Sequence, residues 1–179
     1  GAYYVPTPVP NGSDFTALSP SGSGHLCGVR ADSSVACWGS NSAGQLGSAE
    51  PGYSEQPIVV PGLQDVVSVS IGTATIQNLF VFPGSTCAVI ANGSVACWGS
   101  NEAGELGDGT TTPRATPAAV VGLSGVTAVA VGATDVIEHG AHVCALHASG
   151  EVSCWGSNDL GELGDGTTTS RSTPARVSF

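Results

Sequence analysis

The sequence has very little positive charge. It contains no lysine and four arginines, against 14 acidic residues, and its formal net charge is -10. Proteins that bind nucleic acids draw much of their affinity from clustered cations that contact the phosphates. The sequence has no such cluster, so we expect that the chain does not bind nucleic acid.

The sequence also lacks a long apolar run. Although 41% of the residues are hydrophobic, no stretch comes near the ~20 consecutive apolar residues of a membrane helix. Helix signals are scarce, whereas alternating apolar positions, β-branched residues and glycine-containing turns are frequent. We therefore expect an all-β protein that is not inserted in a membrane.

What the sequence does contain is one unit in three copies. The string CGVRADSSVACWGSNSAGQLG at 27–47 recurs as CAVIANGSVACWGSNEAGELG at 87–107 and as CALHASGEVSCWGSNDLGELG at 144–164. Repeats of this length indicate one supersecondary unit that is stacked on its own copies. Each copy predicts four short strands: an alternating strand, a hairpin, and a last strand with a proline near its start. A proline is best tolerated in an edge strand, because it cannot donate to the ladder.

The motifs HLCGV, HVCAL, SVACWGSN and GQLG resemble the RCC1 repeat, which is the blade of a seven-bladed β-propeller. The resemblance covers nearly the whole chain and implies three four-stranded blades, at 15–63, 64–123 and 124–179. Residues 1–14 would add a surplus fourth strand and a linker. The resemblance also implies a buried, hydrogen-bonding role for His25 and His142.

All six cysteines lie at the same two positions of the repeated unit. With a three-residue hairpin turn, the two cysteines of a copy face each other across adjacent strands, within reach of a disulfide. The alternative is a metal site, but only two copies carry a histidine close to the first cysteine. The repeat favours three disulfides within the blades: Cys27–Cys37, Cys87–Cys97 and Cys144–Cys154.

Stable disulfides indicate an oxidising compartment, so we expect a protein that is secreted, extracellular or on a cell surface. The sequons at Asn11 and Asn92 are candidate glycosylation sites in a eukaryotic host. The best-known role of the resembled family, nucleotide exchange on a nuclear GTPase together with chromatin binding, fits neither this compartment nor this charge. A fold by itself does not confer a function.

No catalytic constellation is recognisable. Trp38, Trp98 and Trp155 occupy one repeated position, which favours packing within or between blades over ligand stacking. No serine lies in a nucleophile motif, and the cysteines are assigned to disulfides. We predict that the chain is not an enzyme and that it binds no cofactor or metal.

Residues that differ between the copies are better candidates for a binding site, because scaffold residues repeat. The connection between the first and second strands is long and apolar in the second copy and distinct in the third. Such a loop contacts a partner or folds back over its own blade. The candidate residues are Ile76, Leu79, Phe80, Val81, Phe82, Val136 and Ile137.

Three blades cannot close a propeller ring, and open blade faces must be covered. Val5, Thr7, Pro8 and Val9 resemble the last strand of a blade, so the chain has one such strand in surplus. We predict a non-catalytic extracellular interaction module that binds a protein or glycan partner through blade loops. Two alternatives stay open: a structural subunit that self-assembles into a ring or filament by strand donation, and a fragment of a longer seven-bladed propeller.

Overall fold

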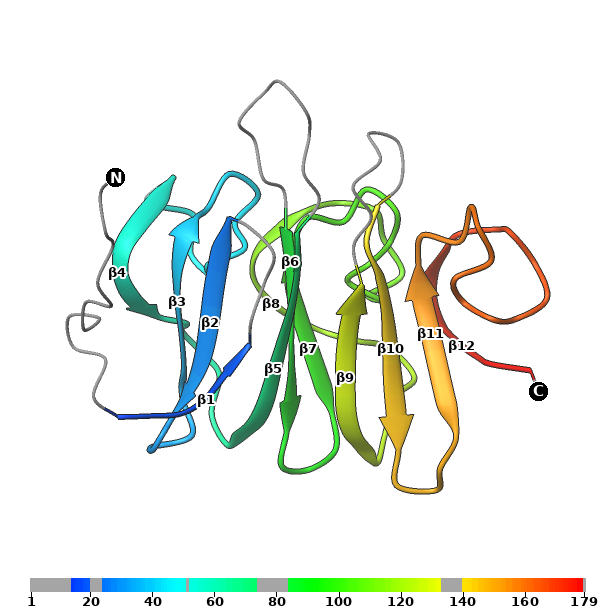
Figure 1. The fold of residues 1–179 in the computed structure, drawn as a ribbon, viewed down its shortest axis with the longest axis horizontal. Helices are drawn as coiled ribbons and strands as arrows, with labels where there is room; N and C mark the ends of the chain where they lie inside the picture. The colour runs from blue at the N-terminus through cyan, green and yellow to red at the C-terminus, as the bar shows by residue number, and fades with distance from the viewer. Residues whose placement is uncertain (1–13, 20–23, 51, 74–83, 133–139, 179) are drawn as a thin grey trace, which may run out of the picture.

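The computed structural model describes residues 14–19, 24–50, 52–73, 84–132 and 140–178 (Figure 1). Within these residues all regular structure is β, with twelve strands in three four-stranded antiparallel sheets. None of the described residues forms a helix long and apolar enough to cross a membrane. The all-β fold with four-stranded blades is confirmed.

Each sheet follows chain order from its first strand to its last. Blade 1 contains β1 (Phe15–Ser19), β2 (His25–Arg30), β3 (Val35–Ser40) and β4 (Tyr53–Val59). Blade 2 contains β5 (Val66–Thr73), β6 (Gly84–Ile90), β7 (Val95–Gly99) and β8 (Arg114–Ala119). Blade 3 contains β9 (Val126–Gly132), β10 (His142–His147), β11 (Val152–Gly156) and β12 (Arg171–Arg176). These strands lie inside the three ranges expected from the repeats, while the blade boundaries themselves stay a prediction.

The hairpin in the middle of each blade is closed by a residue with left-handed backbone. In blade 2 this residue is Gly93, at φ +80°, and the Asn92 side chain accepts a hydrogen bond from the Ser94 N–H at 2.9 Å. A Cβ atom at Gly93 would lie 2.8 Å from the backbone of Gly125. Glycine is therefore required here both by the turn and by the close approach of the next blade.

The last strand of each sheet is an edge strand that carries a proline, as the sequence predicted. The prolines are Pro57 in β4, Pro117 in β8 and Pro174 in β12. The strands begin several residues before their prolines, at Tyr53 in β4 and Arg114 in β8, so the proline lies further inside the strand than the sequence predicted. Most residues before each proline are polar and all are at least partly exposed, so hydrophobic alternation does not mark them.

The three blades lie side by side in chain order (Figure 1). Strand β5 contacts both β2 of the preceding blade and β9 of the following blade. One apolar core joins blade 1 to blade 2 and a second joins blade 2 to blade 3. The interior of the molecule is thus the set of blade-to-blade contacts rather than a single central core.

Each blade has two different faces. The cysteine face carries the disulfide and, in blade 1, also Val29 and Val35. The tryptophan face is the opposite one and carries, in blade 2, Ala88, Ala96 and Trp98. In both cores the cysteine face of one blade packs against the tryptophan face of the next. This order leaves the tryptophan face of blade 1 and the cysteine face of blade 3 without a neighbouring blade.

The exposure of one repeated position shows the consequence. Val29 and Val89 are 4% and 0% exposed, whereas Leu146, at the same position of blade 3, is 43% exposed. The ring is incomplete, and an apolar side chain that a neighbour covers in the other blades meets solvent here.

Candidate functional site

The three disulfides join the pairs expected from the hairpin register. Cys27–Cys37, Cys87–Cys97 and Cys144–Cys154 each bridge the two middle strands of a blade, with Cα atoms 4.1 Å apart. Each bridged pair is also a directly opposed pair of the antiparallel ladder. The cysteines of blades 1 and 2 lie within the two apolar cores.

A polar loop follows the third strand of every blade and is held by one asparagine. In blade 2 the Asn101 Oδ1 accepts from the Leu106 N–H at 2.9 Å, and its Nδ2 donates to the Thr110 and Thr112 carbonyls. Asn41 and Asn158 make the same bond to Leu46 and Leu163. The repeated SN pair in the sequence could have signalled this role, which the sequence reasoning missed.

The tryptophans connect the blades through this loop. The Trp98 Nε1–H donates to the Gln45 carbonyl of the preceding blade at 2.9 Å, and the Trp155 Nε1–H donates to the Glu105 carbonyl at 2.9 Å. Both indoles are fully buried. The packing role predicted for the repeated tryptophan is confirmed for these two, and the hydrogen bond adds a fixed register between neighbouring blades.

His25 takes part in the contact between blades 1 and 2. The Thr86 hydroxyl donates to the Gln45 carbonyl at 3.0 Å, so the His25 Nε2, 3.0 Å from the same hydroxyl, is the donor to Thr86 Oγ1. Burial lowers the pKa of His25 to about 4. The neutral ring is therefore a structural part of the interface, as the resemblance implied.

The loop also places an acidic side chain at the contact between blades 2 and 3. Glu105 is 1% exposed, and its Oε2 accepts from the Ala103 N–H at 2.9 Å. Burial raises the pKa of this carboxyl. Gln45 occupies the same position in blade 1 and accepts from the Ala43 N–H in the same way.

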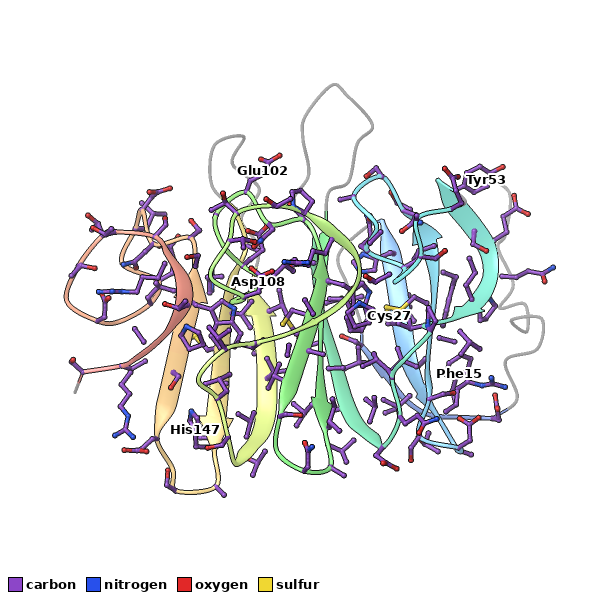
Figure 2. The ribbon with its side chains drawn as sticks, turned by 180° about the vertical axis from the view of Figure 1, so that it is seen from behind. Phe15, Cys27, Tyr53, Glu102, Asp108 and His147 are labelled. Atoms are coloured by element: carbon purple, nitrogen blue, oxygen red, sulfur yellow. A yellow bond between two sulfur atoms is a disulfide. The ribbon has the colours of Figure 1, made fainter. Side chains whose placement is uncertain are left out.

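Blades 2 and 3 each contain an ion pair at the end of this loop. Asp108 pairs with Arg114 and Asp165 pairs with Arg171, at 2.5 and 2.6 Å. Hydrogen bonds from the Thr167 hydroxyl and from Arg171 lower the pKa of Asp165 to about 2. Both carboxylates are thus occupied within their own turns (Figure 2 labels Asp108).

Most of the predicted contact residues lie outside the described part of the chain. This holds for the loop candidates Ile76, Leu79, Phe80, Val81, Phe82, Val136 and Ile137, and for Val5, Thr7, Pro8, Val9 and Asn11. Asn92 is described: it is exposed at the tip of the β6–β7 hairpin, where its Oδ1 also accepts from the Ser94 hydroxyl at 2.7 Å. These residues therefore stay predictions, and the site below is built from the described part of the chain.

What the geometry does present is two half-made blade contacts. At the first blade, Trp38 is partly exposed and lies beside Phe15, with ring centroids 5.5 Å apart, and it forms no hydrogen bond with the described residues. At the third blade, a Cβ atom on Gly161 would have only the Thr167 carbonyl nearby, at 3.9 Å, whereas at Gly104 it would lie 2.5 Å from Ser172 in the next blade. We call these surfaces the first and third open faces.

Family models described as "Regulator of chromosome condensation (RCC1) repeat" match four segments of the chain. One model matches 32–75 and 92–137, and a second matches 15–45 and 140–162. The chain belongs to the RCC1 repeat family. The family assignment agrees with the three four-stranded blades.

Two curated relatives are much longer than the segment that matches this chain. The chain is 30% identical over 161 residues to the human "E3 ubiquitin-protein ligase HERC2". The aligned segment makes up 86% of this chain and 3% of that protein. The chain is 28% identical over 159 residues to the Arabidopsis thaliana "Ultraviolet-B receptor UVR8". The aligned segment makes up 87% of this chain and 33% of that receptor. The chain thus spans a third or less of either relative.

Two solved structures share the fold. Yeast RCC1 (Prp20), in its complex with Kap60, matches with a TM-score of 0.73 at 18% identity, over 93% of this chain and 37% of that one. Human WBSCR16 matches with a TM-score of 0.71 at 23% identity, over 92% of this chain and 40% of that one. These likenesses establish the propeller blades, and the chain spans less than half of either structure.

Proposed function

We propose that this chain is a non-catalytic protein-interaction module that works in an oxidising compartment, as a secreted or cell-surface protein. The observation that carries the proposal is the pair of open faces. Each face is one half of a contact that is made twice inside the chain. A protein partner with a complementary surface would complete it, whereas a small molecule is too small to cover a blade.

The repeated contact tells what a partner must offer. Twice, an indole N–H reaches the carbonyl at the Gln45 or Glu105 position of the preceding blade. The first open face presents Trp38, and the third presents the same loop with Glu162 at that position. A partner for the third face therefore needs an apolar surface with a hydrogen-bond donor at its centre, and an RCC1-type blade has both.

A second candidate function is self-assembly, in which the third face of one copy packs on the first face of another. Inside the chain, Ser19 Oγ accepts from the Ile71 N–H and Ser70 Oγ accepts from the Val131 N–H. The matching acceptor position of blade 3 is Ala130, which has no hydroxyl. The matching donor position of blade 1 follows Ser19 in the sequence and is a proline, which has no N–H. When the third face of one copy packs on the first face of another, the missing hydroxyl therefore meets the missing N–H. This packing leaves no acceptor or donor without a partner at that position.

The compartment rests on the three disulfides, which persist under oxidising conditions. Asn11 and Asn92, of which Asn92 is exposed, would be the candidate glycosylation sites in a eukaryotic host. The net charge of -10 opposes binding to nucleic acid. Yeast RCC1 (Prp20) is bound by Kap60 in one solved structure, and a second structure of it is accompanied by its binding properties to Gsp1p and histones. A propeller of this family can therefore act by binding proteins.

The apolar loop residues Ile76, Leu79, Phe80, Val81 and Phe82 stay candidates for contact with a protein or glycan partner, as do Val136 and Ile137. Strand donation by residues 5–9 and completion by further blades of a longer propeller stay alternatives for closure.

The proposal is tested by sedimentation velocity over a range of protein concentrations, with and without a charged substitution on the third face. Leu146→Asp changes a side chain that is 43% exposed on that face, and Val121→Asp changes one that is equally exposed, at 43%, away from it. We expect concentration-dependent association of the wild type and of Val121→Asp, and its loss in Leu146→Asp. Association that is equal in all three proteins would contradict self-assembly through the third open face. A wild type that stays monomeric and binds no protein by either face would contradict the open-face proposal altogether.

A further inference from the structure

Blade 3 contains a polar pocket that lies apart from the open faces. The pocket has a volume of about 430 Å³ and is formed between the segment 122–125, which connects blade 2 to blade 3, and the β10–β11 turn with strand β12. Figure 2 shows His147 near the turn that joins β10 to β11. The polar side chains on the pocket wall belong to Ser124, His147, Ser149, Glu151, Ser153 and Arg176.

His147 is held in one orientation by two hydrogen bonds. Its Nδ1 lies 2.9 Å from the Ser124 carbonyl, and its Nε2 lies 3.0 Å from the Ser153 hydroxyl. A carbonyl can only accept, so Nδ1 carries the proton and Nε2 of the neutral ring accepts from Ser153. Ser153 is 6% exposed. We therefore assign this serine to fixing the ring rather than to attack on a bound molecule.

The mouth of the pocket carries one ion pair. Arg176 Nη1 donates to Glu151 Oε1, and the Ser149 hydroxyl donates to Glu151 Oε2 at 3.2 Å. The arginine and glutamate side chains are 74% and 46% exposed. The charges of this ion pair cancel. The pocket thus offers hydroxyl, carboxylate, guanidinium and imidazole groups, and its ion pair adds no net charge.

These side chains are peculiar to blade 3. Strand register aligns the positions, since Ser153 faces Arg176 as Ala96 faces Ala119 in blade 2. The four positions of His147, Glu151, Ser153 and Arg176 hold Ile90, Ser94, Ala96 and Ala119 in blade 2, and Arg30, Ser34, Ala36 and Val59 in blade 1. A blade folds without the polar set, so the fold does not require it.

We propose that this pocket binds a neutral carbohydrate, with Glu151 and Arg176 contacting its hydroxyl groups. A sugar hydroxyl donates to a carboxylate and accepts from a guanidinium, and a vicinal pair of hydroxyls can do both at once. The balanced charge of the pocket offers nothing extra to an ionic ligand, and the net charge of -10 opposes an anionic one. The pocket is separate from the open faces, so this inference and the proposed function can fail independently.

The test is a ligand-observed NMR titration of the 179-residue protein with four neutral sugars: glucose, galactose, mannose and N-acetylglucosamine. Glucuronic acid and glucosamine serve as charged comparisons. The first variant combines Glu151→Ser with Arg176→Ala, which installs the residues of blade 2 and leaves the net charge unchanged. The control combines Asp14→Ser with Arg30→Ala, which removes the ion pair of blade 1 and changes charge in the same way.

We expect at least one neutral sugar to bind the wild type and the control equally. Its affinity for the first variant should fall about tenfold or more, which corresponds to about 1.4 kcal/mol. A second variant, His147→Ile with Ser153→Ala, should weaken binding as well, and its circular dichroism shows whether the blade remains folded. The proposal is overturned if no neutral sugar binds the wild type, if only the charged sugars bind, or if the folded variants bind as the wild type does.

Discussion

Replacing each tryptophan by phenylalanine tests how the blades are joined. Trp155→Phe removes the N–H that pairs with the Glu105 carbonyl, and a carbonyl left unpaired inside a protein costs about 1–3 kcal/mol. The smaller ring leaves a cavity that costs about 1 kcal/mol more. We therefore expect Trp155→Phe to lower the free energy of unfolding by about 2–4 kcal/mol.

The same substitution should cost less in the other two blades. After Trp98→Phe the Gln45 carbonyl keeps its bond from the Thr86 hydroxyl, so the expected loss is about 1–2 kcal/mol. Trp38 lies on the first open face, and its indole N–H forms no hydrogen bond with a described residue, so Trp38→Phe should change stability by less than about 0.5 kcal/mol.

Urea unfolding followed by far-ultraviolet circular dichroism, under non-reducing conditions, measures the three differences. Dichroism is the suitable signal because the substitutions change the tryptophan fluorescence itself. The expected order of destabilisation is Trp155, then Trp98, then Trp38. The reasoning would be refuted if Trp38→Phe cost as much as Trp155→Phe, since the carbonyl bond could then not be the cause.

Three further predictions follow from the site. Burial raises the pKa of the Glu105 carboxyl, so the folded protein is more stable when this carboxyl is protonated and loses stability as pH rises through its folded pKa. Glu105→Gln, which installs the residue found at position 45, should therefore stabilise the protein more at pH 7 than at pH 4. Thermal unfolding at the two pH values measures the difference. Replacing both Cys87 and Cys97 by alanine removes a bridge across a separation of 10 residues and should cost about 3 kcal/mol in urea unfolding, with no loss contradicting the assignment. The pKa of Asp165, lowered to about 2, means that its stabilising effect is present above the unfolded pKa and is lost as pH falls toward 2, so an NMR titration of its carboxyl should give a midpoint well below that of an unfolded chain.

Much of the fold could be predicted because each blade repeats the same local signals. Alternation and turn residues located the hairpins, and the spacing of Cys87 and Cys97 gave their register. The start of β4 at Tyr53 could not be predicted in this way, because an exposed edge strand does not alternate. The Asn101 loop was missed for a related reason: its bonds run to backbone groups whose position depends on the loop as a whole.

The candidate sites depended on contacts between distant segments, which the sequence does not display. The position of Trp155 predicted packing, but its carbonyl partner lies 50 residues earlier, in another blade. The blade 3 pocket requires the ladder that sets Ser153 opposite Arg176, and it also requires the connection at 122–125. Spacing along the chain gives no indication that these segments meet.

Comparison of the blades at matched register separates residues that hold the fold from residues that are free to serve a function. A side chain that is present in every blade, such as the tryptophan, has a structural contact wherever a neighbouring blade exists. A side chain that is polar in one blade and apolar in another, such as Ser153 against Ala96, is not needed for that contact. Exchanging residues between matched positions therefore alters one blade while using only side chains that the same architecture already accommodates. If such an exchange weakens binding but not stability, the exchanged side chain contacts the ligand. If it lowers stability, the exchanged side chain contributes to the contact between blades.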